Sequence, residues 1–185
     1  ISLKVLLSDQ LRFMNNYFDV IGVSSEGKEL KELEKIEGIK TIKLNMSRKI
    51  TPIRDFISLL RAIYLILKEK PDIVHTHMLK AGIIGMMASW ICRVPYRFHT
   101  VAGLPLIEAK NNKKKILKFV EKLTYFFATK VYPNSKGLEN YILENKFTKK
   151  EKLKVIGYGS SNGIDTEYFF KSDNVIQKSL EIIKF

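Results

Sequence analysis

The stretch from Lys70 to Ile107 constrains the fold more than any other part of the chain, because it reads as a strand, a helix and a second strand. The short apolar run from Asp72 to Val74 is typical of a strand buried on both faces of a parallel sheet. The small, apolar residues from Lys80 to Ile91 favour a crossover helix packed closely on that sheet. Pro95 disfavours helical backbone before it, and Tyr96 to Phe98 begins the next strand. We therefore predict a βαβ unit.

Both predicted strands end in polar residues, His75-Thr76-His77 in the first and His99-Thr100 in the second. Open α/β sheets bind ligands in the crevice outside the carboxyl ends of their strands. A loop with Gly103 follows the second strand, and a glycine there lets the backbone approach a ligand closely. We expect the His99 imidazole to point into this crevice.

The rest of the chain alternates between helical and strand patterns. Thr51 followed by Pro52 is a favourable helix start, and Ser135 is a candidate N-cap. Alternation of this kind predicts an α/β fold with a Rossmann-like open, mostly parallel sheet and helices on both faces. The expected helices are 1–14, 27–36, 53–68, 112–129 and 135–145, and the expected further strands are 19–23, 40–44, 131–132 and 153–156.

The length of 185 residues fits one domain, or one domain with a piece of another. The formal net charge of +13 indicates an anionic partner, either nucleic acid, phospholipid or a phosphorylated substrate, although lysines on a solvated surface explain it equally well. A single cysteine, Cys92, excludes an internal disulfide. The longest nearly uncharged stretch, 81–92, is too short to span a bilayer.

Two pairs of motifs carry a family resemblance. "PDIVHTHMLKAGIIG" is followed by "VPYRFHTVAGLP", and further along come "VYPNSKGLENYILENKF" and "KLKVIGYGSSNGIDTEYF". In this order and spacing they resemble the N-terminal domain of family 4 retaining glycosyltransferases of the GT-B fold. The most similar branch builds bacterial capsular and O-antigen polysaccharides, and the resemblance covers nearly the whole chain.

The resemblance implies an N-terminal acceptor-binding domain at residues 1–165 and a linker, or the start of a C-terminal nucleotide-sugar-binding domain, at 166–185. It implies a retaining hexosyltransferase that moves a sugar from a nucleotide diphosphate sugar to a polyprenyl-diphosphate-linked glycan, with the donor-binding domain in cis or in trans. Both ends look incomplete against this family pattern, so the fragment alone is expected to be inactive. The alternative is a non-catalytic subunit of a split glycosyltransferase that binds the acceptor and recruits the enzyme to the membrane.

The resemblance also implies roles for individual residues. His99 is expected to be catalytic, by contacting and orienting the donor sugar. A metal site made by His75, His77 and His99 is disfavoured because no carboxylate or cysteine has ligand spacing to them, so we expect no cofactor and no essential metal. The expected substrate-binding residues are His77, Lys80, Thr100, Gly103, Asn162 and Gly163.

The segment from Lys110 to Lys130 is a basic amphipathic helix by its pattern, a form typical of membrane surfaces. We expect it to pack part of its apolar face on the sheet while its basic end stays free for an anionic membrane. The protein is then cytoplasmic and peripheral on the inner face of the cytoplasmic membrane. The expected membrane-binding residues are Lys113, Lys114, Lys115 and Lys118.

Three other classes of protein fit less well. Binding to nucleic acid needs aromatic residues exposed among the lysines, whereas the aromatic residues here follow core spacing. A sugar-nucleotide epimerase or dehydrogenase is disfavoured because no G-x-G-x-x-G follows a strand. Glycoside hydrolysis needs paired carboxylates in the crevice, and the loops after the strands supply few.

Overall fold

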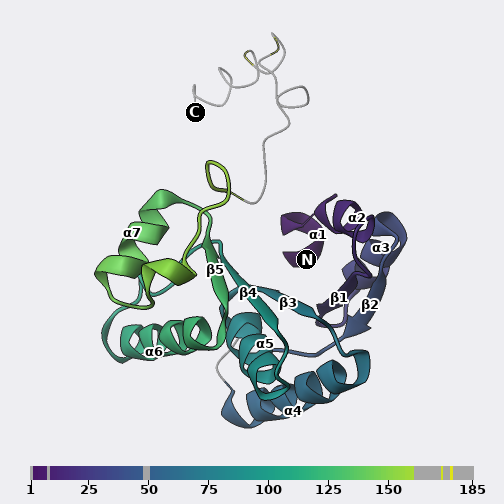
Figure 1. Ribbon diagram of the computed structural model, residues 1–185, viewed down its shortest axis with the longest axis horizontal. Helices are drawn as coiled ribbons and strands as arrows, with labels where there is room; N and C mark the ends of the chain where they lie inside the picture. Colours follow the sequence, from purple (N-terminus) through teal and green to yellow (C-terminus); the bar gives the residue numbers. More distant parts are fainter. Residues whose placement is uncertain (1, 8, 48–50, 161–171, 173–175, 177–185) are drawn as a thin grey trace.

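The computed structural model describes residues 2–7, 9–47, 51–160, 172 and 176, and within them helices alternate with parallel strands (Figure 1). This arrangement confirms the predicted fold class. The helices are α1 Ser2–Leu6, α2 Gln10–Asn15, α3 Lys28–Glu37, α4 Pro52–Glu69, α5 Leu79–Ile91, α6 Asn111–Phe127, α7 Lys136–Glu144 and the short 3-10 helix η1 Lys150–Lys152. The strands are β1 Ile21–Ser24, β2 Lys40–Lys43, β3 Ile73–His77, β4 Tyr96–Val101 and β5 Lys130–Pro133.

The strands form two parallel sheets rather than one. β1 pairs with β2, and β3, β4 and β5 pair in that order. Within the described part of the chain, no strand joins β1 to β3, although β3 is the strand nearest to the two-stranded sheet (Figure 1). The predicted parallel direction is therefore confirmed, and the predicted continuity of the sheet is not.

Helices cover both sides of the strands. α4, α5 and α6 lie together on one side, while α1, α2 and α3 lie on the other side of β1 and β2 (Figure 1). α5 lies between α4 and α6 and packs against both (Figure 1). The middle helix of this layer, α5, begins at Leu79, two residues after β3 ends at His77. The first turn of α5 therefore lies beside the carboxyl end of β3.

α5 approaches the sheet closely because two glycines face it. A Cβ atom added at Gly82 would lie 2.6 Å from His99 Cε1, and one added at Gly85 would lie 2.6 Å from Thr76 Cγ2. Both distances are far below van der Waals contact, so larger residues at these two positions would push the helix away from the strands. The predicted close packing of a small-residue crossover helix is confirmed.

The main core lies between α5, the β4–β5 pair, α6 and α7. Its largest fully buried side chain is Tyr125, which packs with Phe147 at a ring-centroid distance of 6.4 Å. The other buried members are Met86, Val101, Leu104, Leu106, Leu117, Phe127, Ala128, Val131, Ile142 and Leu153. A second, smaller cluster joins α4 and α5 through Ala62, Ile84 and Ala88 with Leu44.

The main core also buries an acidic residue, Glu121, which is 3% exposed. Neither Glu121 Oε2 nor the neighbouring Tyr125 hydroxyl has a hydrogen-bond partner among the described residues. Burial raises the pKa of Glu121 to about 7, because the charged carboxylate loses its hydration inside the core. Burial in the core thus brings the titration of Glu121 into the physiological range.

Two basic side chains cap the C-terminus of α6, where backbone carbonyls lack helical partners. Lys152 Nζ donates to the carbonyls of Tyr125, Phe126 and Ala128 at 3.0, 2.9 and 2.8 Å. Arg97 Nε donates to the Phe127 carbonyl at 2.7 Å. η1 and β4 are thereby tied to the end of α6.

Two predicted elements differ from the structure. The helix expected over 1–14 is two short helices, and Asp9 between them has a φ of 62°, which ends one helix before the next begins. The strand expected over 153–156 is a single bridge from Leu153 to Val131. η1 precedes this bridge, and a turn with Gly157 at φ 56° begins after Ile156.

Candidate functional site

The register of β3 and β4 brings the predicted polar residues together at the carboxyl ends of the strands. Thr76 lies opposite His99, and His77 lies opposite Thr100. Successive side chains in a strand point to opposite faces of a sheet. The polar residues therefore divide into one pair on the face of the helices α5 and α6 and another group on the opposite face.

His99 lies on the helix-facing side and is 2% exposed. Its Nδ1 is 2.9 Å from Thr76 Oγ1, and its ring packs against Gly82 and against the Tyr125 ring at a centroid distance of 5.9 Å. The expectation that the imidazole points into the crevice is therefore wrong for this structure. The reason is strand alternation, because His99 shares a face with the buried core rather than with Thr100.

Burial, with a smaller contribution from the nearby His77, lowers the pKa of His99 to about 3. The ring is consequently neutral at physiological pH. A neutral imidazole with one nitrogen held by Thr76 can fix the relative position of the two strand ends. Its geometry suits a positioning role better than direct contact with a substrate.

The opposite face of the strands carries His75, His77 and Thr100. His75 Nε2 is 2.8 Å from Thr100 Oγ1, and the His75 and His77 rings have a centroid distance of 4.5 Å. Phe98 and Tyr132 border this group, with centroids 6.0 and 6.1 Å from His75. His77 and Thr100, both predicted to bind substrate, thus lie on one face of the sheet, with Thr100 only 8% exposed. His75, which the prediction omitted from the substrate-binding residues, lies on the same face.

The group around His75 is a set of neutral hydrogen-bonding side chains beside aromatic rings. Burial lowers the pKa of His77 to about 4, so this ring is uncharged at neutral pH. Uncharged donors and acceptors next to aromatic rings suit hydroxyl-rich ligands such as sugars, whose C–H faces pack on aromatic side chains. The signal for His75 in the sequence was its two-residue spacing from His77, which places both on one strand face.

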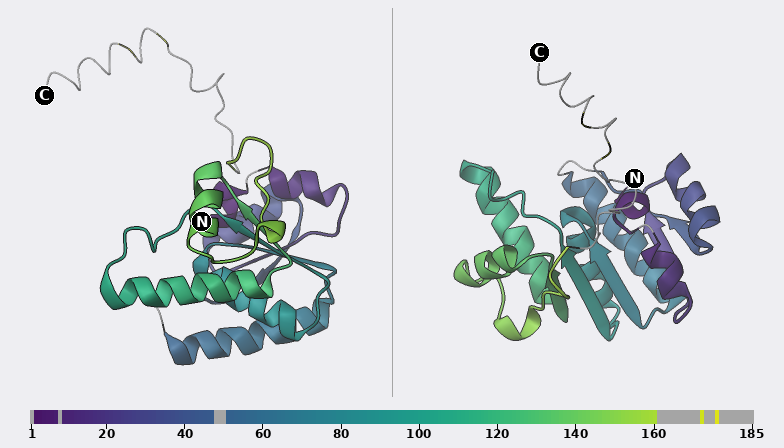
Figure 2. Two further views of the ribbon diagram at one scale, coloured as in Figure 1. Left: turned by 60° about the vertical axis from the view of Figure 1, so that its left-hand side comes forward. Right: turned by 90° about the horizontal axis from the view of Figure 1, so that it is seen from above.

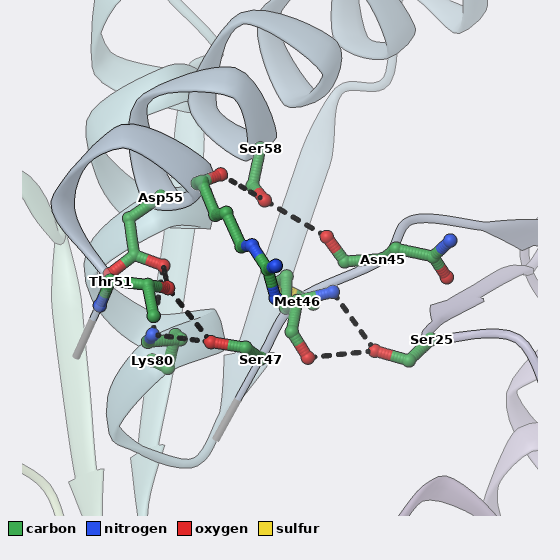
Figure 3. A network of polar contacts seen from close by, with 9 residues as sticks. Ser25, Asn45, Met46, Ser47, Thr51, Asp55, Ser58 and Lys80 are labelled. Carbon is green, nitrogen blue, oxygen red and sulfur yellow. Dashed lines mark hydrogen bonds and ion pairs between the residues drawn. The ribbon is translucent and has the colours of Figure 1, made fainter. Parts of the chain in front are cut away.

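Lys80, predicted to bind an anion or a sugar, forms an ion pair within the protein. Its Nζ lies 2.8 Å from Asp55 Oδ1 and 3.4 Å from Ser47 Oγ (Figure 3). Burial of Asp55 alone would raise the pKa of its carboxyl, but the hydrogen bonds from Lys80 and Thr51 and the charge of Lys80 lower it overall. Asp55 therefore balances the charge of Lys80.

Asp55 also fixes the start of α4. Thr51 occupies the N-cap position and Pro52 the first turn, as predicted, but the Thr51 side chain does not cap the helix. Instead, Asp55 Oδ2 accepts a hydrogen bond from the Thr51 backbone N–H at 3.1 Å (Figure 3). Since Lys80 lies in the first turn of α5, this contact joins the N-termini of α4 and α5 beside the end of β3.

The same polar network continues from α4 to the connection after β2. Ser58 Oγ donates to the Asn45 carbonyl at 2.9 Å, and the Met46 backbone N–H donates to Ser25 Oγ at 3.1 Å (Figure 3). The network therefore ties β1, the segment after β2 and α4 to the edge of the crevice.

The remaining predicted substrate-binding residues are Gly103, Asn162 and Gly163. Gly103 is exposed, and an added Cβ there would meet no atom within 4 Å, so open space adjoins this backbone. Asn162 and Gly163 lie outside the described residues, as does the predicted domain boundary after residue 165. Ser135, predicted to be an N-cap, accepts a hydrogen bond from the Leu138 N–H at 3.2 Å and so caps α7.

The predicted membrane-binding lysines lie at the start of α6. Lys113, Lys114 and Lys115 are exposed, whereas Lys118 is half-buried with its Nζ 5.6 Å from the centroid of the Phe147 ring. The first turn of α6 contains no acidic residue. Lysines at a helix N-terminus oppose the helix dipole, and each such contact typically costs a few tenths of a kcal/mol or more. The cluster is locally unfavourable, which is consistent with use by an anionic partner.

Among the residues that the structure describes, no three His, Cys, Asp or Glu side chains come together as a metal site would require. Within the same residues, no helix combines the length and the apolar character needed to cross a bilayer.

The sequence matches the family described as glycosyl transferase 4-like over residues 4–135. It is 38% identical over 174 residues to the capsular polysaccharide biosynthesis glycosyltransferase CapM of Staphylococcus aureus, covering 94% of this chain and 45% of the relative. It is 35% identical over 175 residues to the UDP-Gal:alpha-D-GlcNAc-diphosphoundecaprenol alpha-1,3-galactosyltransferase of Escherichia coli, covering 92% of this chain and 43% of the relative. The chain spans a little under half the length of both relatives.

Solved structures share the fold. A glycosyltransferase from Rickettsia africae matches with a TM-score of 0.64 and 20% identity, over 99% of this chain and 46% of that protein. The UDP-GlcNAc 2-epimerase of Methanocaldococcus jannaschii matches with a TM-score of 0.60 and 17% identity, over 82% of this chain and 42% of that protein. Because transferases and epimerases share this fold, the fold alone does not distinguish the two activities.

Proposed function

The chain belongs to the glycosyl transferase 4-like family, and from this premise we propose that it is the acceptor-binding half of a retaining glycosyltransferase. The observation that carries the proposal is the 38% identity to the capsular glycosyltransferase of S. aureus across 94% of this chain. Identity at this level favours transfer over the epimerisation that the shared fold also supports. The full reaction is transfer of a hexose from a nucleotide diphosphate sugar, in capsular or related surface polysaccharide synthesis.

The proposed acceptor is a glycan linked to a polyprenyl diphosphate. The E. coli relative is named for a diphosphoundecaprenol-linked acceptor and for UDP-galactose as donor, which supports this chemistry here. The donor-binding residues are proposed to lie in a second half, supplied in cis or in trans. No metal or other cofactor is part of the proposed reaction, and this chain contributes positioning and electrostatics.

We assign the substrate contacts to the open strand face. His77 and Thr100 stand at the carboxyl ends of β3 and β4, with His75 bonded to Thr100. Gly103 adds exposed backbone in the following loop. Lys80 holds the crevice edge in place through its ion pair with Asp55. His99 lies on the buried face of the strands and positions Thr76 through their hydrogen bond.

The exposed lysines at the start of α6 support a peripheral position on the cytoplasmic face of the membrane. Lys113, Lys114 and Lys115 stand at the helix end that follows β4, on the side of the crevice. Each basic residue near an anionic leaflet contributes about 1 kcal/mol of attraction, which decays within a Debye length.

The test replaces the first half of the S. aureus relative with this chain. Restored capsule synthesis by the chimera is expected, together with loss of at least about tenfold in transfer when His77 becomes Ala or Thr100 becomes Val, because one hydrogen bond to a reacting sugar is worth about 1.5 kcal/mol. A folded chimera that reaches the membrane but transfers no sugar would instead favour the non-catalytic, membrane-recruiting subunit.

Calorimetry provides a second measurement. Because the donor site is proposed to lie in the other half, this chain alone should bind UDP- and GDP-sugars more weakly than about 1 μM, which corresponds to about −8 kcal/mol. Micromolar binding by the isolated chain would place the donor site in this chain and contradict the proposal that the donor binds to the other half.

A further inference from the structure

Helix α4 presents a stripe of large apolar side chains to solvent. The residues Ser58 and Ala62 face inward and are 4% exposed. On the opposite side of the helix, the exposed side chains are Ile53 at 80%, Phe56 at 61%, Ile57 at 43%, Leu60 at 51%, Tyr64 at 70% and Leu67 at 58%. At 100° per residue these six positions fall within an arc of roughly 100° that runs the length of the helix. We call them the α4 stripe.

The α4 stripe has a basic border. Arg54, Arg61 and Lys68 are exposed and recur every seven residues, so they line one side of it. Both acidic residues of α4 already have basic partners, since Asp55 pairs with Lys80 at 2.8 Å and Glu69 pairs with Lys40 at 2.7 Å. The outer face of α4 is therefore apolar with a positive edge.

This polarity is unusual for a helix on a water-soluble surface. Such helices normally turn their large apolar residues to the core and their charges outward. A contiguous exposed apolar patch rimmed by polar residues marks an interaction surface. An apolar face bordered by Lys and Arg is the composition of helices that lie in the interface plane of a bilayer.

We propose that the α4 stripe docks into the headgroup–acyl boundary of an anionic membrane leaflet. The apolar residues enter the boundary, and Arg54, Arg61 and Lys68 contact lipid phosphates. A second copy of the chain fits less well, because a symmetric contact would bring the basic border against itself with no unpaired carboxylate of α4 to balance it. Nucleic acid would match the border but would leave the apolar residues in water.

Docking through α4 would bring the crevice close to the membrane surface. The Asp55–Lys80 ion pair joins the first turns of α4 and α5, and α5 begins directly after β3 (Figure 3). The contact with lipid therefore starts beside the crevice. This deepens the proposed function by placing a lipid-linked substrate next to the open strand face, and only that consequence rests on the proposed function.

The α4 stripe is separate from the lysines of α6, which lie across α5 on the other side of the helix layer (Figure 2). The α6 lysines act by charge, whereas the α4 stripe acts by insertion. The two surfaces can be removed one at a time.

The experiment reads insertion with a tryptophan. Trp90, the single tryptophan, is changed to Phe, and Tyr64→Trp is added within the α4 stripe. With vesicles that contain phosphatidylglycerol, the emission should shift to the blue and be quenched by brominated acyl chains. Tyr158→Trp in the same Trp90→Phe background is the matched control, since Tyr158 is fully exposed away from α4, and its emission should not change.

Vesicle sedimentation then measures how much the apolar residues and the basic border each contribute to membrane binding. Ile53→Ser, Leu60→Ser and Leu67→Ser together should lower partitioning at least tenfold, with an unchanged melting curve because all three are exposed. The matched triple, Ile36→Ser, Ile107→Ser and Ile156→Ser, removes equally exposed residues elsewhere and should bind as before. Arg54→Gln, Arg61→Gln and Lys68→Gln should lower partitioning about a hundredfold, at about 1 kcal/mol each.

Three results would overturn the docking proposal. The emission of the Tyr64→Trp protein could be insensitive to anionic vesicles, or the α4 serine triple could sediment like the parent. Alternatively, the chain could form a dimer without vesicles that the same triple dissolves, which assigns the stripe to a second copy. Docking with no transfer by the S. aureus chimera would contradict the proposed function alone.

Discussion

The two faces of the β3–β4 pair differ more than their adjacent sequence suggests. On the helix side, Thr76 and His99 are buried and held at 2.9 Å under Gly82 and Gly85. On the other side, His75 and Thr100 are held at 2.8 Å on a face bordered by aromatic rings. Thr76 and Thr100 are both 8% exposed, so the faces differ in their imidazoles, because His99 is buried whereas His75 is exposed. One sequence motif thus supplies both a sealed imidazole and an open one.

The difference shows that residues on the two faces of one strand end can have different roles. A residue on the sealed face affects function through the position of the backbone, whereas a residue on the open face can touch a ligand. Variants on the sealed face should therefore alter stability, and variants on the open face should alter binding. Four measurements test this contrast between the two faces and the elements around them.

The largest effect is expected from filling the space between α5 and the sheet. Gly82→Val places atoms within the His99 ring, because even a Cβ would lie 2.6 Å from Cε1. Overpacking of this kind should lower the free energy of unfolding by about 3 kcal/mol or more in urea denaturation. Gly103→Ala, where nothing lies within 4 Å, is the matched control and should change stability by no more than about 0.5 kcal/mol. Equal effects at both glycines would contradict the close approach of α5.

The next effect concerns Glu121, which lies on the buried face of α6. Its folded pKa of about 7 is above its unfolded value, so the folded protein binds the extra proton and ionisation destabilises it as pH rises. Glu121→Gln should therefore raise the free energy of unfolding by about 2–3 kcal/mol at about pH 9 and by little below about pH 4. Denaturation curves across pH measure this difference, and a constant gain at every pH would rule out the titration as its cause.

The third effect compares the two faces directly. His99→Ala leaves a cavity and removes the hydrogen-bond partner of Thr76, so it should cost about 2 kcal/mol in stability. His75→Ala on the open face should cost about 0.5 kcal/mol but should weaken sugar transfer by the chimera. If His99→Ala lowers turnover at full stability, His99 contacts the substrate directly.

The smallest effect is expected at the ion pair between α4 and α5. Lys80 and Thr51 hold the pKa of Asp55 below its ordinary value despite its partial burial. This stabilisation is complete above the unfolded pKa and is lost as pH falls through the lower folded pKa. Asp55→Asn should cost about 1 kcal/mol at neutral pH, since the Asp55 and Lys80 side chains are both partly exposed. It should cost nothing once the Asp55 carboxyl is protonated in both the folded and the unfolded states. An undiminished difference at low pH would contradict the assignment.

The sequence was sufficient for the order and direction of the elements because hydrophobic periodicity and the start signals at Thr51, Pro52 and Ser135 are local. It also placed His77 and Thr100 among the substrate-binding residues, since both belong to the polar residues at the carboxyl ends of their strands. It did not predict the burial of His99, because the face that a strand turns inward depends on the helix that covers it. The partner of Lys80 was missed for a similar reason, since Asp55 lies 25 positions away on a helix that packs only in three dimensions.

The capping of α6 by Lys152 has a mechanical consequence. The segment from Lys152 to Ser160 is fastened at both ends, by three carbonyls of the α6 end and by the hydrogen bond from the Ser160 N–H to the Asn134 carbonyl at 2.6 Å. Gly159, at φ 92°, lies against the same Asn134 carbonyl so closely that no side chain would fit. Tension applied to the chain after Ser160 would therefore be transmitted to the junction between β5 and α7 at Asn134 and to the C-terminal end of α6.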